Sequence, residues 1–301
     1  MLPDELVEGA RPQAQGERSQ SGSPLARRIG EEVAHCAKYA PGSPMAVDHE
    51  QEPAEAGAPV GHAAPGAEDE DYSQPVLPDE GASDYERYLS TDALLSLQKP
   101  AGERAHHDEL LFQTVHQSSE LWLQLAWTEV ETATEHVVRG ELGAALRLLR
   151  RAALCLQYIH GQLDMLEQMS PWEYQSVREV LGHGSGFDSP GFRQIRRVSP
   201  LLGEAFQDAL AAAGLDVVSV YTEGREHEEL YGLAEALVEW DERVALWRVR
   251  HYKVVARIIG DHVVGTQGTP VEVLGRLIHR SMYPDLWEAR NQLTALAQER
   301  A

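Results

Sequence analysis

From residue 84 onward, apolar side chains in this 301-residue chain recur at steps of three and four residues. This period matches the turn of an α-helix, whereas the two-residue alternation typical of strands is almost absent. The clearest stripe lies in residues 141–169 and consists of Leu142, Leu146, Leu149, Leu156, Ile159, Leu163 and Leu166. The pattern predicts an all-α fold in which helices bury their apolar faces in the core of a bundle.

Further helices are predicted at residues 84–97, 108–138, 171–181, 227–260, 270–281 and 285–298. The helix over 171–181 begins with Ser170 and Pro171, because proline fits the first turn of a helix. The glycines and proline of GHGSGFDSPG, residues 182–191, predict a loop. The stretch from this loop to residue 227 is less regular.

The first 80 residues differ from the rest in charge. They hold 16 acidic and 5 basic side chains, so they contribute half of the net charge of −22, and every Trp and Phe lies after residue 110. Such a segment buries too little apolar surface to offset the entropy cost of ordering. We therefore expect a disordered acidic tail over residues 1–80 and a helical domain over residues 81–301.

The composition also argues against several classes of partner. Nucleic acids and anionic membranes attract basic patches, so neither is expected to bind this acidic chain. No segment offers the roughly twenty apolar residues that span a bilayer, and the N-terminus does not resemble a secretory signal. Because Cys36 and Cys155 are the only cysteines, a disulfide framework is not expected either. We expect a soluble, cytoplasmic protein.

Candidate binding residues occur in two pairs with i and i+4 spacing, and the two members of each pair lie on the same face of a helix. Phe112 and His116 lie in HHDELLFQTVHQSSELW, residues 106–122, and would direct an aromatic wall and a titratable ring into one cavity. Tyr174 and Arg178 form the second pair, and a planar guanidinium can bind a carboxylate through two parallel hydrogen bonds.

A simpler alternative exists for Arg178, which could form an ordinary surface ion pair with Glu173 or Glu179. The loop VVGTQGTP, residues 263–270, adds the hydroxyl of Thr266 and could fold over a small polar ligand. It lacks the lysine of the phosphate-binding loop pattern.

His251 belongs to the apolar stripe of the 227–260 helix, which is formed by Trp240, Val244, Trp247, His251, Val254 and Ile258. A histidine in such a seam is either a satisfied core residue or a ligand. The two tryptophans before it either belong to the core or line the edge of a planar macrocycle. Together with Phe112 and His116, the stripe suggests a buried site for a flat aromatic molecule and a haem bound by His251.

A non-haem metal site in the helical bundle is a second hypothesis. It rests on the density of possible ligands at Glu103, His106, His107, Asp108 and Glu109. Di-iron bundles need Glu-x-x-His on two helices and further glutamates on two more, and only the step from Glu103 to His106 fits well.

Five ordered blocks of the sequence resemble the tryptophan 2,3-dioxygenase family, whose members are haem enzymes that open the indole ring. The resemblance spans roughly residues 84–294, and its blocks are YERYLSTDALL, HHDELLFQTVHQSSELW, YQSVREVLGHGSGFDSPGFR, LWRVRHYKVVARIIG with the following GTQG, and YPDLWEAR. It implies an all-α bundle of the tryptophan 2,3-dioxygenase and indoleamine dioxygenase type. It also implies haem b as cofactor, with L-tryptophan or an analogue and O2 as substrates.

The resemblance assigns roles to individual residues. It makes His251 the proximal haem ligand, His116 the distal histidine that meets the indole nitrogen, and Arg178 the carboxylate clamp. The remaining matches are Phe112 as the wall against the indole, Thr266 as the loop residue that meets the ammonium and carboxylate, and Tyr174 and Ser185 as further pocket residues. Tyr85 and Tyr88 match tyrosines that reach a neighbouring subunit's site, which implies a homotetramer.

The chain departs from the family pattern in one loop. Where the family's loop reads GTGGSSG, this chain has GTQGTPV, so Gln267 and Pro270 replace flexible or hydroxylated positions. Three functions therefore stay open. They are 2,3-dioxygenation to N-formylkynurenine in tryptophan catabolism by the kynurenine pathway, monooxygenation of a tryptophan derivative to an oxindole-type product in natural-product biosynthesis, and haem sensing without turnover.

Overall fold

The computed structural model describes residue 28 and residues 74–300. The described residues form α-helices and short 3-10 helices without any strand, and a single isolated β-bridge pairs Val264 with Pro270. The predicted all-α class is therefore confirmed. Most of the tail predicted over residues 1–80 lies outside the described residues.

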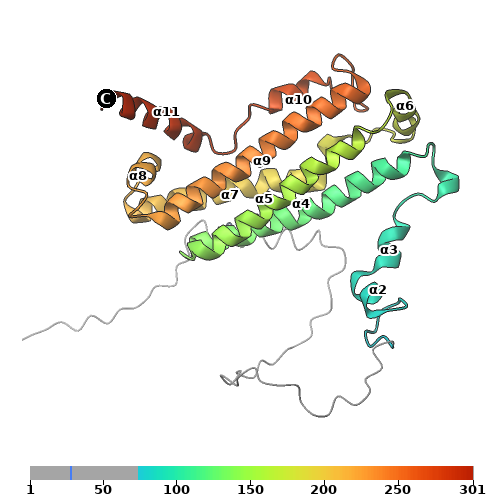
Figure 1. Ribbon diagram of the computed structural model, residues 1–301, viewed down its shortest axis with the longest axis horizontal. Helices are drawn as coiled ribbons and strands as arrows, with labels where there is room; N and C mark the ends of the chain where they lie inside the picture. Colours follow the sequence, from blue (N-terminus) through green and yellow to red (C-terminus); the bar gives the residue numbers. More distant parts are fainter. Residues whose placement is uncertain (1–27, 29–73, 301) are drawn as a thin grey trace, which may run out of the picture. The chain divides into compact units, whose positions relative to one another are not determined.

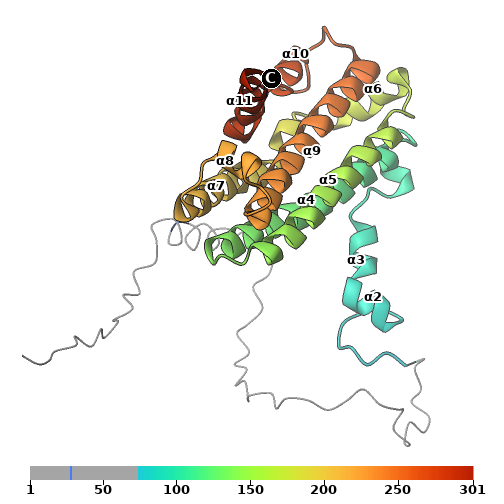
Figure 2. The ribbon, with the colours of Figure 1, turned by 60° about the vertical axis from the view of Figure 1, so that its left-hand side comes forward.

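Four long helices lie side by side and form the core (Figure 1 and Figure 2). They are α4 (Glu109–Val138), α5 (Leu142–Leu166), α7 (Pro190–Ala213) and α9 (Glu228–Ile259). Helix α5 packs against α4 and α9, and α4 also packs against α7. Of the leucine stripe predicted for α5, the part from Leu149 to Leu166 is buried, and each such side chain contributes about 1.5–3 kcal/mol.

Helix α7 corrects our interpretation of residues 191–227 as less regular. Ser189 caps its N-terminus by accepting a hydrogen bond from Phe192 N, and Gly214 ends it with φ of 71°. The helix contains Pro200, which obscures the periodicity. Its buried face nevertheless repeats at helical spacing through Ile195, Val198, Leu202, Ala205, Phe206 and Leu210.

The helix predicted over residues 84–97 is divided into α2 (Asp84–Leu89) and α3 (Thr91–Ser96). The break falls at Ser90, whose φ of 50° lies in the left-handed region and cannot continue a helix. A capping box between Ser83 and Glu86 begins α2. No residue of α2 or α3 is buried, so packing does not hold these two helices as it holds the bundle.

The shorter elements follow the long helices along the chain. They are η1 (Ala101–Glu103), α6 (Pro171–Val180), η2 (Gly186–Asp188), α8 (Val217–Thr222), α10 (Glu272–Leu277) and α11 (Pro284–Glu299). Helix α10 is shorter than predicted. The buried carboxylate of Asp241 accepts hydrogen bonds from Ser281 Oγ at 2.5 Å and from Met282 N at 3.1 Å, which holds residues 281–282 in a non-helical conformation.

None of the helices in residues 74–300 combines the length and the apolar character that crossing a bilayer requires.

An apolar cluster marks the end of the bundle where α4 begins and α5 and α9 end. Its buried members are Val115, Leu163, Leu166, Met169, Val177, Val254 and Ile258. Phe112, Tyr174 and Trp247 are half-buried against it. The cluster therefore supports Phe112 on α4, Tyr174 on α6 and Trp247 on α9.

Candidate functional site

Phe112 and His116 lie one turn apart near the start of α4. Their ring centroids are 4.0 Å apart, and the Phe112 ring is 6.0 Å from the ring of Tyr174 on α6. Burial raises the pKa of the Tyr174 hydroxyl, so this group stays protonated. Helices α4 and α6 thus bring three rings together against the apolar cluster.

The hydrogen bonding of His116 defines its tautomer. Nδ1 lies 2.7 Å from the carbonyl oxygen of Phe112. A carbonyl oxygen only accepts, so Nδ1 carries the proton and donates it. The His116 ring keeps exposed surface, yet desolvation by the surrounding protein lowers its pKa, as expected for a ring in a recess. In the neutral ring, Nε2 is then free to accept a hydrogen bond from an N–H group.

His251 on α9 stacks on Trp247, with ring centroids 4.8 Å apart and an angle of 9° between the planes. Burial, followed by the effect of a charge on His116, lowers the pKa of His251 to about 4. The ring is therefore neutral at physiological pH. Neither of its nitrogens forms a hydrogen bond within residues 74–300, so it is not a satisfied core histidine.

The two tryptophans before His251 have different roles. Trp240 is fully buried and donates from Nε1 to Ser199 Oγ at 3.0 Å, which makes it an ordinary core residue. Trp247 stacks on His251 and also contacts Phe192, whose ring centroid lies 4.0 Å from that of Trp247. The buried Nε1 of Trp247 has no hydrogen-bond partner in the described part of the chain.

Helix α6 positions Arg178. Ser170 caps this helix by accepting a hydrogen bond from Glu173 N, and Pro171 occupies its first turn, as predicted. Arg178 donates from a guanidinium nitrogen to the carbonyl oxygen of Val264 at 2.6 Å. Among the described residues it forms no ion pair with Glu173 or Glu179, so the simple surface ion pair is not observed.

Thr266 lies in a short hairpin, residues 263–271, that follows α9. Backbone hydrogen bonds join Val271 N to Val263 O at 3.1 Å and Gly265 N to Thr269 O at 2.9 Å. The Thr266 hydroxyl donates to the carbonyl oxygen of Gly184. The hairpin therefore contacts both α6, through Arg178, and the loop at residues 182–189.

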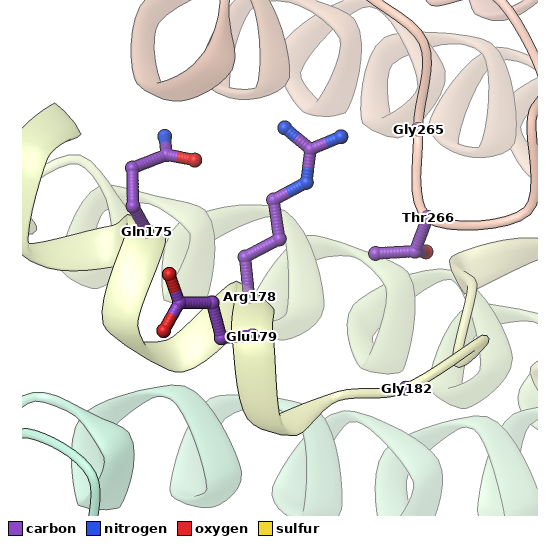
Figure 3. A pocket seen from close by; sticks show the side chains of 6 residues that line it. All are labelled: Gln175, Arg178, Glu179, Gly182, Gly265 and Thr266. Atoms are coloured by element: carbon purple, nitrogen blue, oxygen red, sulfur yellow. The ribbon is translucent and has the colours of Figure 1, made fainter.

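Arg178 and Thr266 line a pocket of about 410 Å³ together with Gln175, Glu179, Gly182 and Gly265. Figure 3 shows the guanidinium extending from α6 toward the segment that carries Gly265 and Thr266. Glu179 points away from Thr266 in the same view. The cation and the hydroxyl thus share one pocket, in which the guanidinium can bind an anionic group.

The remaining predicted residues are not among those that line this pocket. Ser185 is half-buried, and its hydroxyl accepts a hydrogen bond from Phe187 N as the cap of η2. Tyr85 and Tyr88 lie on α2 and are 70% and 78% exposed, so the chain does not bring them to the other site residues through its own packing. Their role in a neighbouring subunit stays a prediction.

The donor chemistry at His251 fits a ligand of haem iron. A neutral, unpartnered imidazole offers a lone pair, and the buried Nε1–H of Trp247 beside it is a second polar group without a partner. Cys155 is buried, and desolvation raises the pKa of its thiol, so it stays protonated and is a poor ligand.

The side chains proposed for a non-haem metal site do not converge. Within residues 74–300 no group of three or more His, Cys, Asp or Glu is arranged to hold a metal ion. Glu109 instead pairs with Lys99 at 2.6 Å and accepts a hydrogen bond from Ala105 N. The Nε2 atom of His106 lies 3.8 Å from Glu173. Glu109 is therefore engaged in an ion pair with Lys99 and in holding the backbone at the start of α4.

Several residues near the site were not predicted from the sequence. Gln175 lines the pocket, and its i+3 spacing to Arg178 on a predicted helix would have indicated this. Glu120 lies one turn after His116 and accepts hydrogen bonds from Ser189 Oγ and Gly191 N. Asp188 accepts a hydrogen bond from Gln267. No local signal in the sequence indicates these last two contacts.

Comparison with known proteins identifies the family of this chain. The family described as Tryptophan 2,3-dioxygenase matches residues 70–205. A protein of that name from Caulobacter vibrioides is 33% identical, and the match covers 69% of this chain and 98% of the relative. Another from Bacillus anthracis is 32% identical, with coverage of 69% and 92%. This chain therefore belongs to the tryptophan 2,3-dioxygenase family of enzymes.

Proposed function

We propose that this protein is a haem-dependent oxygenase that oxidises the indole ring of L-tryptophan or of a modified tryptophan. The favoured reaction is 2,3-dioxygenation to N-formylkynurenine, as in tryptophan catabolism. One observation carries the proposal: His116 presents a hydrogen-bond acceptor at the end of the bundle where Arg178 presents a cation and His251 an unpartnered imidazole. The names of the relatives support the same activity.

His251 would hold the iron of haem b, and Trp247 would fix the plane of its ring by stacking. When bound, the haem supplies the activation of O2 that oxidation of an indole ring requires. The low pKa of His251 favours this role, because protons do not compete for the ligating nitrogen at neutral pH.

Arg178 and Thr266 would bind the amino-acid end of the substrate. The guanidinium already donates one hydrogen bond to Val264 O, which orients it and leaves further N–H groups for the carboxylate. The Thr266 hydroxyl lies in the same pocket, and because it donates its proton to Gly184 O, its lone pairs can accept a hydrogen bond from the ammonium group. Tyr174 and Ser185 would complete the pocket from α6 and the loop before α7.

Phe112 and His116 would orient the indole. The Phe112 ring offers a flat apolar wall, and Nε2 of His116 can accept the hydrogen bond of the indole N–H. Holding both ends of the substrate contributes to the rate, because the reacting ring is then positioned before the chemical step.

The alternatives differ in which of these residues they need. A haem sensor without turnover needs His251 but neither the Arg178 cation nor the His116 acceptor. Monooxygenation of a tryptophan derivative to an oxindole-type product needs all three. A modified tryptophan stays an alternative substrate, because Gln267 and Pro270 alter the hairpin that would face the amino-acid end of the substrate.

Isotope labelling tests the proposal and separates the alternatives. Ferrous, haem-loaded protein is incubated with ¹⁸O2 and L-tryptophan, and the product is analysed by mass spectrometry. Two labelled atoms in a ring-opened product support 2,3-dioxygenation, whereas one labelled atom means monooxygenation. If tryptophan and its methyl and hydroxy derivatives all stay unchanged, the enzyme proposal is wrong.

The proposal extends to the assembly and its place in the cell. We expect a cytoplasmic homotetramer in which residues 81–301 form the catalytic domain and residues 1–80 an acidic tail. The large exposed fractions of Tyr85 and Tyr88 support contact with another subunit. Size-exclusion chromatography with light scattering measures the assembly directly.

A further inference from the structure

Gln267 fastens the hairpin at residues 263–271 to the loop at residues 182–189. Its side-chain amide donates a hydrogen bond to Oδ2 of Asp188, the last residue of η2. The adjacent Thr266 donates to the carbonyl oxygen of Gly184 in the same loop. Two consecutive side chains of the hairpin therefore bond one loop, while Arg178 bonds the hairpin from α6.

The loop that receives these bonds is itself anchored on α4. Ser189 Oγ donates to Glu120 Oε1 at 2.5 Å, and Gly191 N donates to Glu120 Oε2 at 2.9 Å. A Cβ atom on Gly191 would lie only 2.5 Å from Cβ of Leu123, so the backbone approaches α4 as closely as glycine allows. Asp188 therefore presents its carboxylate from a fixed support.

The hairpin has little else to hold it. None of the residues 264–270 is buried, so apolar packing contributes little to its position. Inside the hairpin, the turn depends on the Gly265–Thr269 backbone bond of 2.9 Å and on Gly268, whose φ is 76°. Segments with few buried contacts open at low free-energy cost, so side-chain bonds at the tip decide how often this one opens.

We infer that Gln267 and Asp188 form a latch that holds the hairpin closed over the pocket of Arg178 and Thr266. Gln267 is thus a positioning residue, because it keeps the neighbouring Thr266 in place before an amino-acid ligand arrives. The glycine that stands at this position in the family's usual loop has no side chain for such a bond. The inference rests on the proposed function for the identity of the ligand.

Hydrogen exchange in the haem-loaded, substrate-free protein tests the latch without turnover. Exchange of the backbone amides in residues 263–271 should rise about three- to tenfold in Gln267→Ala and in Asp188→Ala, the range expected when one hydrogen bond is lost. The double variant should exchange no faster than either single variant. Gln168→Ala is the matched control, because its amide bonds only Asp164 O of α5 and its loss should leave this exchange unchanged.

A swap of the two groups separates the latch from general loop damage. Gln267→Glu places two carboxylates together and should raise exchange. Adding Asp188→Asn restores an amide and a carboxylate with donor and acceptor exchanged, and should return the exchange rate to within about twofold of the natural chain. Additive effects of the two alanine substitutions, or no rescue by the swap, would overturn the latch.

Kinetics then test the positioning role. With L-tryptophan, Gln267→Ala should raise KM about three- to tenfold and change kcat less than twofold, because an open hairpin lowers the population that binds substrate. The swapped pair should restore KM. Raised exchange with unchanged KM would contradict the positioning role. If no tryptophan derivative reacts at all, the proposed function fails, whereas the exchange measurements still decide whether the latch exists.

Discussion

The imidazole of His251 and the indole of Trp247 are stacked nearly parallel within one turn of α9, at 9° and 4.8 Å between centroids. Phe192 of α7 packs against the same indole at 4.0 Å. The orientation of His251 is therefore set by contacts from two helices. A ligand whose ring plane is fixed loses less conformational freedom when it binds a metal.

Replacing His251 tests the cofactor assignment. His251→Ala should show no Soret band after reconstitution with haemin and removal of the unbound haemin, because the proposed iron ligand is removed. His262→Ala is the matched control, since the side chain of His262 is 86% exposed in the loop after α9 and should leave the spectrum unchanged. A normal Soret band in His251→Ala would show that another group binds the iron.

Replacing Arg178 tests the carboxylate clamp. Arg178→Ala should raise KM by about 30- to 900-fold, equivalent to about 2–4 kcal/mol for a broken charge pair with substrate. The KM of Arg178→Lys should lie between those of the natural chain and of Arg178→Ala, because an ammonium keeps the charge but cannot form two parallel hydrogen bonds. Arg147, which donates to Gly143 O on its own helix, supplies the control Arg147→Ala. Unchanged affinity in Arg178→Ala would remove the assignment.

The tautomer of His116 predicts a substrate preference. The natural chain should discriminate about tenfold against tryptophan methylated on the indole nitrogen, because Nε2 then has no hydrogen to accept. In His116→Ala this discrimination should disappear while the haem spectrum stays intact. The kcat/KM of both substrates with both proteins forms a double-mutant cycle, and equal discrimination in the two proteins contradicts the assigned hydrogen bond.

The pH dependence of stability should reflect Glu109 at the start of α4. The hydrogen bond from Lys99, followed by those from Ala105 and Gln113, holds the pKa of Glu109 below its ordinary value of 4.5 despite burial. Its stabilising contribution is then complete above pH 4.5 and is lost as the pH falls through the lower, folded-state value. Glu109→Gln should lower Tm by about 2–4 °C at pH 7. The difference in Tm between the natural chain and Glu109→Gln should shrink as the pH falls below 4.5. A Tm difference that stays constant with pH would contradict the lowered pKa of Glu109.

Mixed subunits test whether Tyr88 serves another subunit's site. Tyr88→Ala should keep its Tm, since α2 has no buried residue, but should lose activity. Mixing Tyr88→Ala subunits with Arg178→Ala subunits should recover part of the activity, because some mixed oligomers then contain one site with both residues. Mixing two preparations of the same variant is the control. No recovery in the mixture, with exchange of subunits verified by light scattering and mass spectrometry, argues against the shared site.

The helices with long stripes of apolar residues could be predicted, because helical periodicity depends only on residues that are close in the sequence. The stripes of α5 and α9 identified both helices and placed His251 on an apolar seam. The spacing of Phe112 to His116 and of Tyr174 to Arg178 likewise determined which side chains share a face. Helix α7 was not predicted, because Pro200 and the glycines near its start resemble loop signals. In the folded chain, packing against α4 outweighs the low helix propensity of these residues.

The contacts between distant segments were decided by the folded chain path alone. Arg178 bonds Val264 O, 86 residues away, and Gln267 bonds Asp188 across 79 residues, although neither spacing carries a periodic signal. The free nitrogens of His251 depend in the same way on which groups the neighbouring helices present. Local propensity selects helices and faces, whereas hydrogen-bond partners depend on where those helices pack, and so the pocket emerges only in three dimensions.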